Sequence, residues 1–436
     1  MCRRRANGNY RRAKSDIWPA IPLVLENACG MGISMRLDII GLLGACSYAL
    51  DCVEAQLVKV ATGHSKRVAY MSVCMAEQAG VSDDELQDLA ACALLHDNAL
   101  TQYISEEFHN YVDDNTINTI TTGQLGIHCY YGENNLKKYP FNTDMSGVIL
   151  YHHENAEGSG PFSKKWNEIP FFARIIHMCD IVDIFCRTEK INYQTWEKAH
   201  TYILQNKGTM FDDECCELFF KTFTKDNFIV MGNNDFEKLL WRKIPDKQQD
   251  YDKDVCMDIA DLFAKIIDYK SEFTGRHSLG VAKNAAFYSK HMGYDEETVC
   301  KMYLAGALHD IGKIVIDTDI LEKPGRLTED EFSQMKNHAE ATYYILSQVK
   351  DFEDIRDWAA FHHEKLDGSG YPFGKNASEL NTNERLMACV DIYQALTEKR
   401  PYKDGMSHEK ACDILKDMAR KGWIDNNIVE IISNCL

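Results

Sequence analysis

The sequence predicts an all-α protein built from two tandem helical bundle domains. Apolar residues recur at spacings of three and four in segments such as VCKMYLAGALHD and ERLMACVDIYQALTE, which is typical of amphipathic helices. Alternating β-branched runs, which would indicate strands, are few. An internal repeat with an offset of 210 to 213 residues indicates that one helical unit occurs twice.

Length and composition exclude several classes of protein. A chain of 436 residues with 45% hydrophobic residues can bury the cores of two domains, and 11% aromatic residues argue against long disordered stretches. No apolar run approaches the roughly 20 residues that span a bilayer. The 16 cysteines form no CxxC pairs, so we expect reduced, mostly buried thiols in a cytoplasmic protein without membrane contact. A net charge of −18 disfavours binding to DNA or RNA duplexes.

The repeat consists of three pairs of similar segments in the same order. The pairs are TGHSKRVAYMSV (62–73) with TGRHSLGVAKNA (274–285), ALLHD (93–97) with ALHD (307–310), and YHHENAEGSGPF (151–162) with FHHEKLDGSGYPF (361–373). Histidine spacings also agree. His64 and His96 are 32 residues apart, as are His277 and His309. His128 and His152 are 24 residues apart, as are His338 and His362. This agreement makes a chance match implausible.

Both copies end in the same way, with a turn before a terminal helix. Asp212 and Asp425 suit the N-cap positions of these helices. The domain boundaries follow from the repeat. We expect a basic, disordered tail at 1–35, a first helical domain at 36–226, a linker at 227–250 and a second helical domain at 251–436.

The second copy carries a set of residues that commonly bind metals. Its members are His277, His309, Asp310, His338, His362, His363 and Asp391. Facing helices of a bundle can direct such side chains into one site. Imidazoles mixed with carboxylates suit iron, manganese or zinc, whereas structural zinc usually shows cysteines at short spacing. Asp310 is the candidate for a ligand that bridges two ions, because a carboxylate has two oxygens.

Several motifs of the second copy resemble those of a known enzyme family. His277, the His309-Asp310 doublet and Asp391 resemble the HD superfamily of metal-dependent phosphohydrolases. HDIGK, ILEKPGRLTEDEF, NHAEATYYIL, HHEKLDGSGYP and DIYQALTEKRPY resemble its HD-GYP subgroup. The resemblance implies an all-helical fold, two or three divalent metal ions, commonly iron or manganese, and hydrolysis of cyclic di-GMP or a related cyclic dinucleotide.

Further residues of this copy are candidates for contact with substrate. Lys313 lies one helical turn beyond Asp310, so its ammonium could neutralise a phosphate oxygen as a catalytic group. Gly368 and Gly370 permit a tight loop against the ligand pair, and Tyr371 in this loop is a candidate for contact with the dinucleotide. Arg400 is a phosphate candidate or a surface ion pair. Glu272 is a candidate ligand for a third ion. Gln394 stands where the family usually has an acidic residue, which puts one supporting contact in doubt.

The first copy keeps the ligand types and loses the residues that suggest catalysis. A second candidate metal site comprises His64, His96, Asp97, His128, His152, His153 and Asp180. Leu100 replaces the lysine, and the tyrosine of the GSGYP loop is missing. Three interpretations stay open for this copy. It is a regulatory domain that binds metal or ligand, a second catalyst with altered specificity, or a packing partner.

We therefore expect a phosphodiesterase of cyclic dinucleotides whose second domain is catalytic and whose first domain is regulatory. One alternative is an HD-type phosphohydrolase of another nucleotide. Another is a receptor that binds a cyclic dinucleotide and signals to a partner, and a homodimer or signalling partner is compatible with either. The intact Lys313 and the seven ligands favour an enzyme.

Overall fold

The computed structural model describes residues 34–47, 63–100, 102–103, 122–186, 191–232, 236–245, 249–268, 277–321, 323, 325–399 and 404–435. Most of the expected N-terminal tail, Glu272 and Arg400 lie outside these residues. Within the described part the structure is helical apart from one two-stranded sheet, which confirms the predicted all-α class. No helix described there is both long and apolar enough to cross a membrane.

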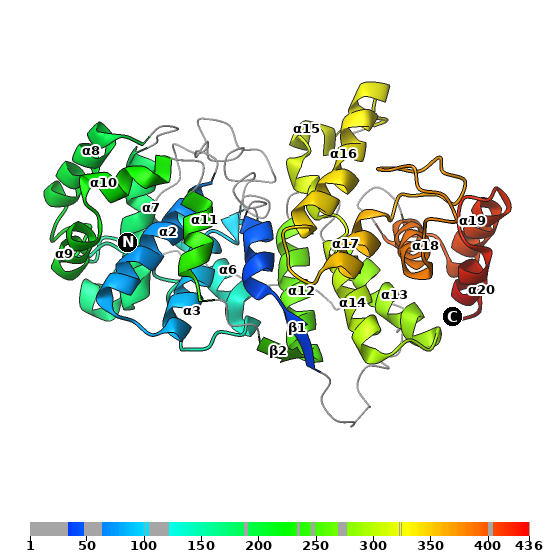
Figure 1. Cartoon of the computed structure of the whole chain (residues 1–436), viewed down its shortest axis with the longest axis horizontal. Helices are drawn as coiled ribbons and strands as arrows, with labels where there is room; N and C mark the ends of the chain where they lie inside the picture. Colours follow the sequence, from blue (N-terminus) through cyan, green and yellow to red (C-terminus); the bar gives the residue numbers. More distant parts are fainter. Residues whose placement is uncertain are drawn as a thin grey trace, which may run out of the picture.

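The first copy occupies the blue-to-green half of the ribbon (Figure 1). It begins with strand β1 and a helical segment at 39–47. Its named elements are β1 (Ser34–Leu37), α2 (His64–Ala79), α3 (Asp83–Leu94), α6 (Thr122–Asn135), η1 (Leu136–Lys138), η2 (Trp166–Glu168), α7 (Phe171–Cys186), α8 (Tyr193–Gln205) and α9 (Asp213–Thr222).

The expected linker contains regular structure, and the second copy follows it. The segment between the copies includes α10 (Lys225–Phe228), η3 (Ile229–Gly232), α11 (Phe236–Lys243) and β2 (Gln249–Asp252). The second copy contains α12 (Lys253–Asp268), α13 (His277–His291), α14 (Glu296–Leu308), η4 (Ile311–Val315), α15 (Thr318–Leu321), α16 (Glu329–Leu346), α17 (Glu353–Ala360), α18 (Thr382–Thr397), α19 (His408–Arg420) and α20 (Asn426–Asn434).

Capping residues set the starts of several helices. The Asp212 carboxylate accepts the Cys215 N–H at the start of α9, and Asp425 accepts the Asn427 N–H at the start of α20, which confirms both predicted N-caps. Thr328 begins α16 with a capping box, in which it exchanges hydrogen bonds with Glu331. The LTEDE part of the ILEKPGRLTEDEF motif therefore starts a helix.

The helices that carry the repeat occupy equivalent places in the two copies. Helix α2 packs against α3 and α7 in the first copy, and α13 packs against α14 and α18 in the second. The facing sides are apolar and fully buried, as at Val68 and Met71 on α2 and at Val281 on α13. Each bundle therefore holds the start of α2 or α13, where the first candidate histidine lies, close to its second and fifth ligand-bearing segments.

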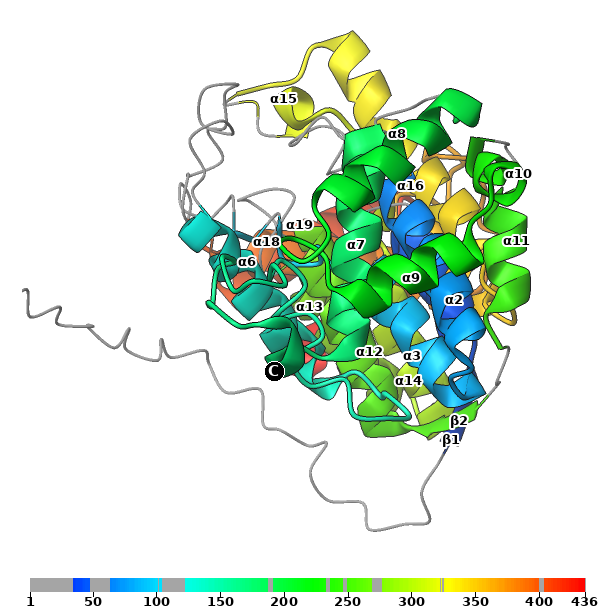
Figure 2. The ribbon, with the colours of Figure 1, turned by 90° about the vertical axis from the view of Figure 1, so that its left-hand side faces the viewer.

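The two copies share one continuous apolar core. Strand β1 pairs antiparallel with β2, with Ser34 opposite Asp252, so the start of the first copy is tied to the segment before the second (Figure 1). Helix α11 packs on α2 (Figure 2). Helix α12 contacts η1, and Lys138 Nζ lies 2.6 Å from Asp258 Oδ1 across this contact. Buried residues of both copies belong to a single hydrophobic cluster.

Candidate metal centre

The ligand candidates of the second copy converge from five segments of the bundle. His277 is the first residue of α13, His309 and Asp310 follow α14, His338 lies on α16, and His362 and His363 form the turn after α17. Asp391 lies in the middle of α18. All are buried except His363, which is partly exposed. The structure therefore brings together the seven residues that the repeat singles out.

Three of these histidines have a defined protonation pattern. The Nδ1 atoms of His309, His338 and His362 lie 2.8, 2.6 and 2.6 Å from the carbonyl oxygens of the residues three positions earlier. A carbonyl oxygen only accepts, so each Nδ1 carries a proton and each neutral Nε2 presents a lone pair. Burial and the neighbouring His363 ring hold the pKa of His362 well below its usual range, which keeps it neutral.

These lone pairs face other acceptors. His338 Nε2 lies 3.4 Å from His362 Nε2, and His309 Nε2 lies 3.1 Å from Asp310 Oδ2. Two acceptors at such distances repel each other unless a cation or proton lies between them. Neutral imidazoles that are anchored through Nδ1 and aimed through Nε2 at carboxylates are the usual arrangement around a bound metal. The residues therefore fit a divalent metal ion.

The carboxylates carry negative charge and reach more than one histidine. Asp310 Oδ2 lies near His309, and Asp310 Oδ1 lies 3.6 Å from His338 Nε2. Asp391 Oδ1 lies 3.0 Å from His277 Nε2 and 3.8 Å from His309 Nε2. Against the effect of burial, His309 and Lys313 hold the pKa of Asp310 well below its usual range. Asp310 and Asp391 are therefore each placed to bind a metal ion together with two different histidines.

Potential ligand atoms form three overlapping groups, within each of which all atoms lie within 4.8 Å of one another. The groups are His277, His309 and Asp391; His309, Asp310 and His362; and His338, His362 and His363. Adjacent groups share a histidine. This arrangement suits a site with more than one ion, because shared and bridging ligands hold cations a few ångströms apart.

Glu398, whose carboxylate contacts the His277 ring, is a residue that sequence reasoning missed. His277 Nδ1 lies 3.1 Å from Glu398 Oε2, the residue that follows α18. Gln394 stands where an acidic partner of His277 was expected, and Glu398 supplies the carboxylate instead. The acidic partner comes from one helical turn further along, and Gln394 instead accepts a hydrogen bond from Asn284. Helical periodicity was the available signal, since residues four apart lie on one face.

Replacing Glu398 by glutamine is expected to weaken metal binding roughly 10- to 100-fold, as for other outer partners of metal-bound histidines. The carboxylate orients the His277 ring and raises its basicity, and an amide does both less well. Competition with a chelator measures the affinity. Glu379→Gln, at a surface loop position where the carboxylate pairs with Asn376, is the matched control and should leave the affinity unchanged. Equal affinities for both variants would contradict the role of Glu398.

Lys313 and the GSGYP loop border the ligands. Lys313 Nζ lies 2.5 Å from Asp310 Oδ2. The Tyr371 ring lies against His363, with 4.7 Å between the ring centroids. Gly370 packs directly on the backbone of Glu364 and Lys365, which leaves no room for a side chain. Gly370 therefore has a packing role whether or not it contacts substrate.

Glu364 is a second residue that sequence reasoning missed. Its carboxylate accepts the backbone N–H groups of Phe373, Gly374 and Lys375, at 2.7, 3.1 and 3.0 Å. It thereby holds the loop against the histidine pair. Glu154 does the same for the equivalent loop of the first copy, where it accepts from Phe162 and Lys164. The shared HHE sequence was the available signal.

The first copy repeats this geometry. His96 and His152 donate through Nδ1 to Ala93 and Ile149, at 2.9 and 2.6 Å, and their Nε2 atoms have no hydrogen-bond partner. Both nitrogens face Asp97, at 3.5 and 3.6 Å, and His128 Nε2 lies 3.3 Å from it. His64 Nε2 lies 3.2 Å from Asp180 Oδ1, and His153 Nδ1 lies 3.7 Å from Asp180 Oδ2. The first copy therefore also brings its seven candidates together.

Two differences separate the first site from the second. Asp183 accepts from His64 Nδ1 at 2.7 Å and from Arg67 Nε at 2.6 Å, so this copy keeps the acidic residue that Gln394 replaces. In the second copy Gly280 stands at the position of Arg67, and Gln394 fills the space that the glycine leaves open.

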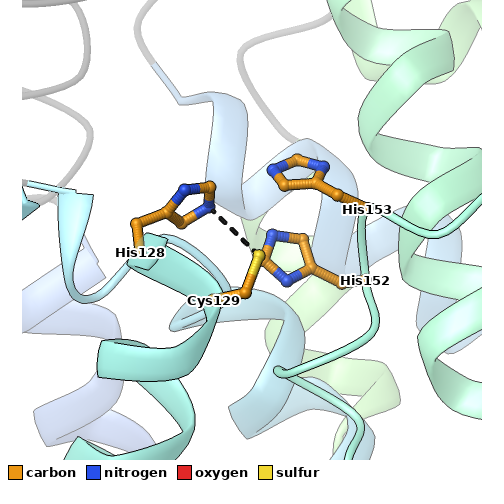
Figure 3. A group of neighbouring side chains, drawn as sticks. All are labelled: His128, Cys129, His152 and His153. Atoms are coloured by element: carbon orange, nitrogen blue, oxygen red, sulfur yellow. Dashed lines mark hydrogen bonds between the residues drawn. The ribbon is translucent and has the colours of Figure 1, made fainter. Parts of the chain in front are cut away.

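The second difference is Cys129, whose thiol lies among His128, His152 and His153 (Figure 3). Burial raises the pKa of this thiol, but the His152 and His128 imidazoles lower it to about 6.

Comparison with known proteins matches both copies to one family. A model described as HD domain matches residues 54–215 and 261–428. A 3'3'-cGAMP-specific phosphodiesterase of Vibrio cholerae is 28% identical over 405 residues, which cover 88% of this chain and 90% of that protein. A cyclic di-GMP phosphodiesterase response regulator of Xanthomonas campestris is 36% identical over 150 residues, 34% of this chain and 40% of the other.

The fold also occurs in a solved structure. The crystal structure of a cyclic GMP-AMP specific phosphodiesterase from Vibrio cholerae superimposes with a TM-score of 0.62. The alignment covers 92% of this chain and 98% of that chain, at 22% identity. The arrangement of two helical copies therefore recurs in another protein.

Proposed function

The chain belongs to the HD domain family, and from this membership and the site we infer that it is a metal-dependent phosphodiesterase of cyclic dinucleotides. We propose that residues 251–436 are the catalytic domain. The bounds of that domain and the role of each copy are part of the proposal. The activity agrees with the names of the relatives, which act on 3'3'-cGAMP or cyclic di-GMP.

One observation supports catalysis by the second copy above all. Lys313 Nζ lies 2.5 Å from Asp310, beside the ligand set, and Leu100 occupies the equivalent position in the first copy. A partly buried ammonium next to the reacting phosphate can neutralise a nonbridging oxygen as negative charge develops. A leucine cannot do so. The two copies thus share ligands and differ in the group that would hold substrate phosphate.

The seven residues of the second copy are the proposed metal ligands. Their nitrogen and oxygen donors suit two or three divalent cations, of iron or manganese. When bound, these cations would supply Lewis-acid activation of the phosphate and of a water. Asp310 is the proposed bridge, because its two oxygens face different histidines. Glu398 and the three backbone carbonyls fix the orientation of the rings.

Tyr371 is the proposed wall of the substrate pocket. Its ring lies next to His363, and Lys336 Nζ, on α16, lies 5.7 Å from the centre of the same ring. An aromatic ring beside a phosphate site can stack on a nucleobase without strong preference for one base. Gly370, in the same loop, is also a proposed substrate contact, and Arg400 stays a sequence-based proposal. The first copy, which has no counterpart of Tyr371, is proposed to be regulatory.

The test is a panel of nucleotides offered to the full chain loaded with manganese or iron. We expect 3'3'-cGAMP, cyclic di-GMP or both to be converted to linear dinucleotides or mononucleotides, and linear mononucleotides to stay intact. Chromatography of the products measures this. Hydrolysis of mononucleotides alone would contradict the substrate class, and tight binding of a cyclic dinucleotide without turnover would identify a receptor instead.

A further inference from the structure

Four side chains of the first copy form a cluster that the second copy does not reproduce. His128 and Cys129 are neighbours on α6, and His152 and His153 lie in the turn that precedes the GSG loop (Figure 3). Their potential ligand atoms all lie within 4.8 Å of one another. We call this group the Cys–His cluster. His128, Cys129 and His152 are at most 2% exposed.

The cluster contains a buried nitrogen that lacks a hydrogen-bond partner. His152 donates through Nδ1 to the Ile149 carbonyl, so its Nε2 presents a lone pair into the cluster. That Nε2 atom has no hydrogen-bond partner, and His152 is 0% exposed. Burying a polar atom without a partner costs about 1–3 kcal/mol. A cation bound within the cluster would remove this cost.

The thiol distinguishes the cluster from its counterpart. The equivalent residues of the second copy are His338, His362 and His363, and Ala339 stands in place of Cys129. A soft thiolate with three imidazoles favours zinc, which takes four such ligands in a tetrahedral shell. The counterpart offers imidazoles and nearby carboxylate oxygens, which suit harder ions. The donor sets of the two copies therefore differ by one thiol.

We propose that the first copy binds a zinc ion through Cys129, His128, His152 and His153. Four protein ligands complete the zinc shell and leave no position open for an attacking water, as in structural zinc sites. The ion stabilises the first copy and does not hydrolyse substrate. This proposal goes beyond the function proposed for the second copy and does not depend on it.

Cobalt(II) absorbance of the full chain tests the proposal. Cobalt replaces zinc and absorbs in the near ultraviolet only where a thiolate binds it, so cobalt in the second copy is silent in this band. We expect the metal-free wild type to gain the thiolate-to-cobalt band and to lose it when zinc is added. Cys129→Ala, which installs the residue found at position 339, should lose the band completely, and so should the similarly sized Cys129→Ser.

Cys74→Ala is the matched control, because Cys74 is buried in the same copy but lies on α2 outside the cluster. It should keep the band. Zinc retained after dialysis should fall by about one ion per chain in both Cys129 variants. A wild type without the band, or a band of equal strength in Cys129→Ser, would overturn the proposal. Hydrolysis is not the readout, so failure here is distinct from failure of the proposed enzyme activity.

Discussion

Removal of the bound metal from the full chain is expected to lower the rate of cyclic dinucleotide hydrolysis by at least about 10³-fold, because metal ions contribute several kcal/mol to stabilising charge in such reactions. Lys313 places one cationic group beside the ligands of the second copy. Its ammonium already pairs with Asp310. The measurement is the initial rate after dialysis against a chelator.

Two controls accompany metal removal. Manganese or iron added back should restore the rate, and far-ultraviolet circular dichroism should show that the second bundle keeps its helices. We expect the helices to persist because α13, α14 and α18 pack through an apolar core that does not include the ligands. Full activity in protein verified to be free of metal would contradict the proposed chemistry.

The second large effect is expected for Lys313→Leu, which copies the residue of the first site. The rate constant kcat should fall about 10²- to 10³-fold, the typical result of removing one group that stabilises developing negative charge. Metal content should stay unchanged, because Lys313 is not among the proposed ligands. Steady-state kinetics together with metal analysis separates these two effects.

Lys290→Leu is the matched control for this substitution. Lys290 also pairs with an acidic residue, Glu296, but it lies at the end of α13 away from the ligands. It should change kcat by less than about twofold, as surface ion pairs contribute little. If Lys313→Leu behaved in the same way, the phosphate-binding role of Lys313 would be wrong.

The all-α class, the repeat and the gathering of both ligand sets were predictable from the sequence. Equal spacing between histidines in two copies is a strong constraint, because a bundle must bring the same helix positions together twice. His64 and His277, for example, each begin a helix, and each lies beside the carboxylate of a helix more than 100 residues later. Helix caps such as Asp212 and Asp425 were also predictable, since their hydrogen bonds are local.

Contacts that depend on tertiary geometry were not predictable in the same way. The partner of His277 comes from Glu398 rather than from position 394, because the space beside Gly280 is taken by Gln394. Cys129 looked like one more buried cysteine, and only its neighbours from a distant turn reveal it as a potential ligand. The pairing of β1 with β2 joins residues more than 200 positions apart, and no local pattern indicated it.

The most direct test of the account compares two matched substitutions, Asp310→Ala in the second copy and Asp97→Ala in the first. Both remove the carboxylate that faces histidines on two sides of its site. We expect Asp310→Ala to abolish hydrolysis of cyclic dinucleotides and Asp97→Ala to retain it within a fewfold of the wild type. If Asp97→Ala abolished hydrolysis and Asp310→Ala did not, the assignment of catalysis to residues 251–436 would be contradicted.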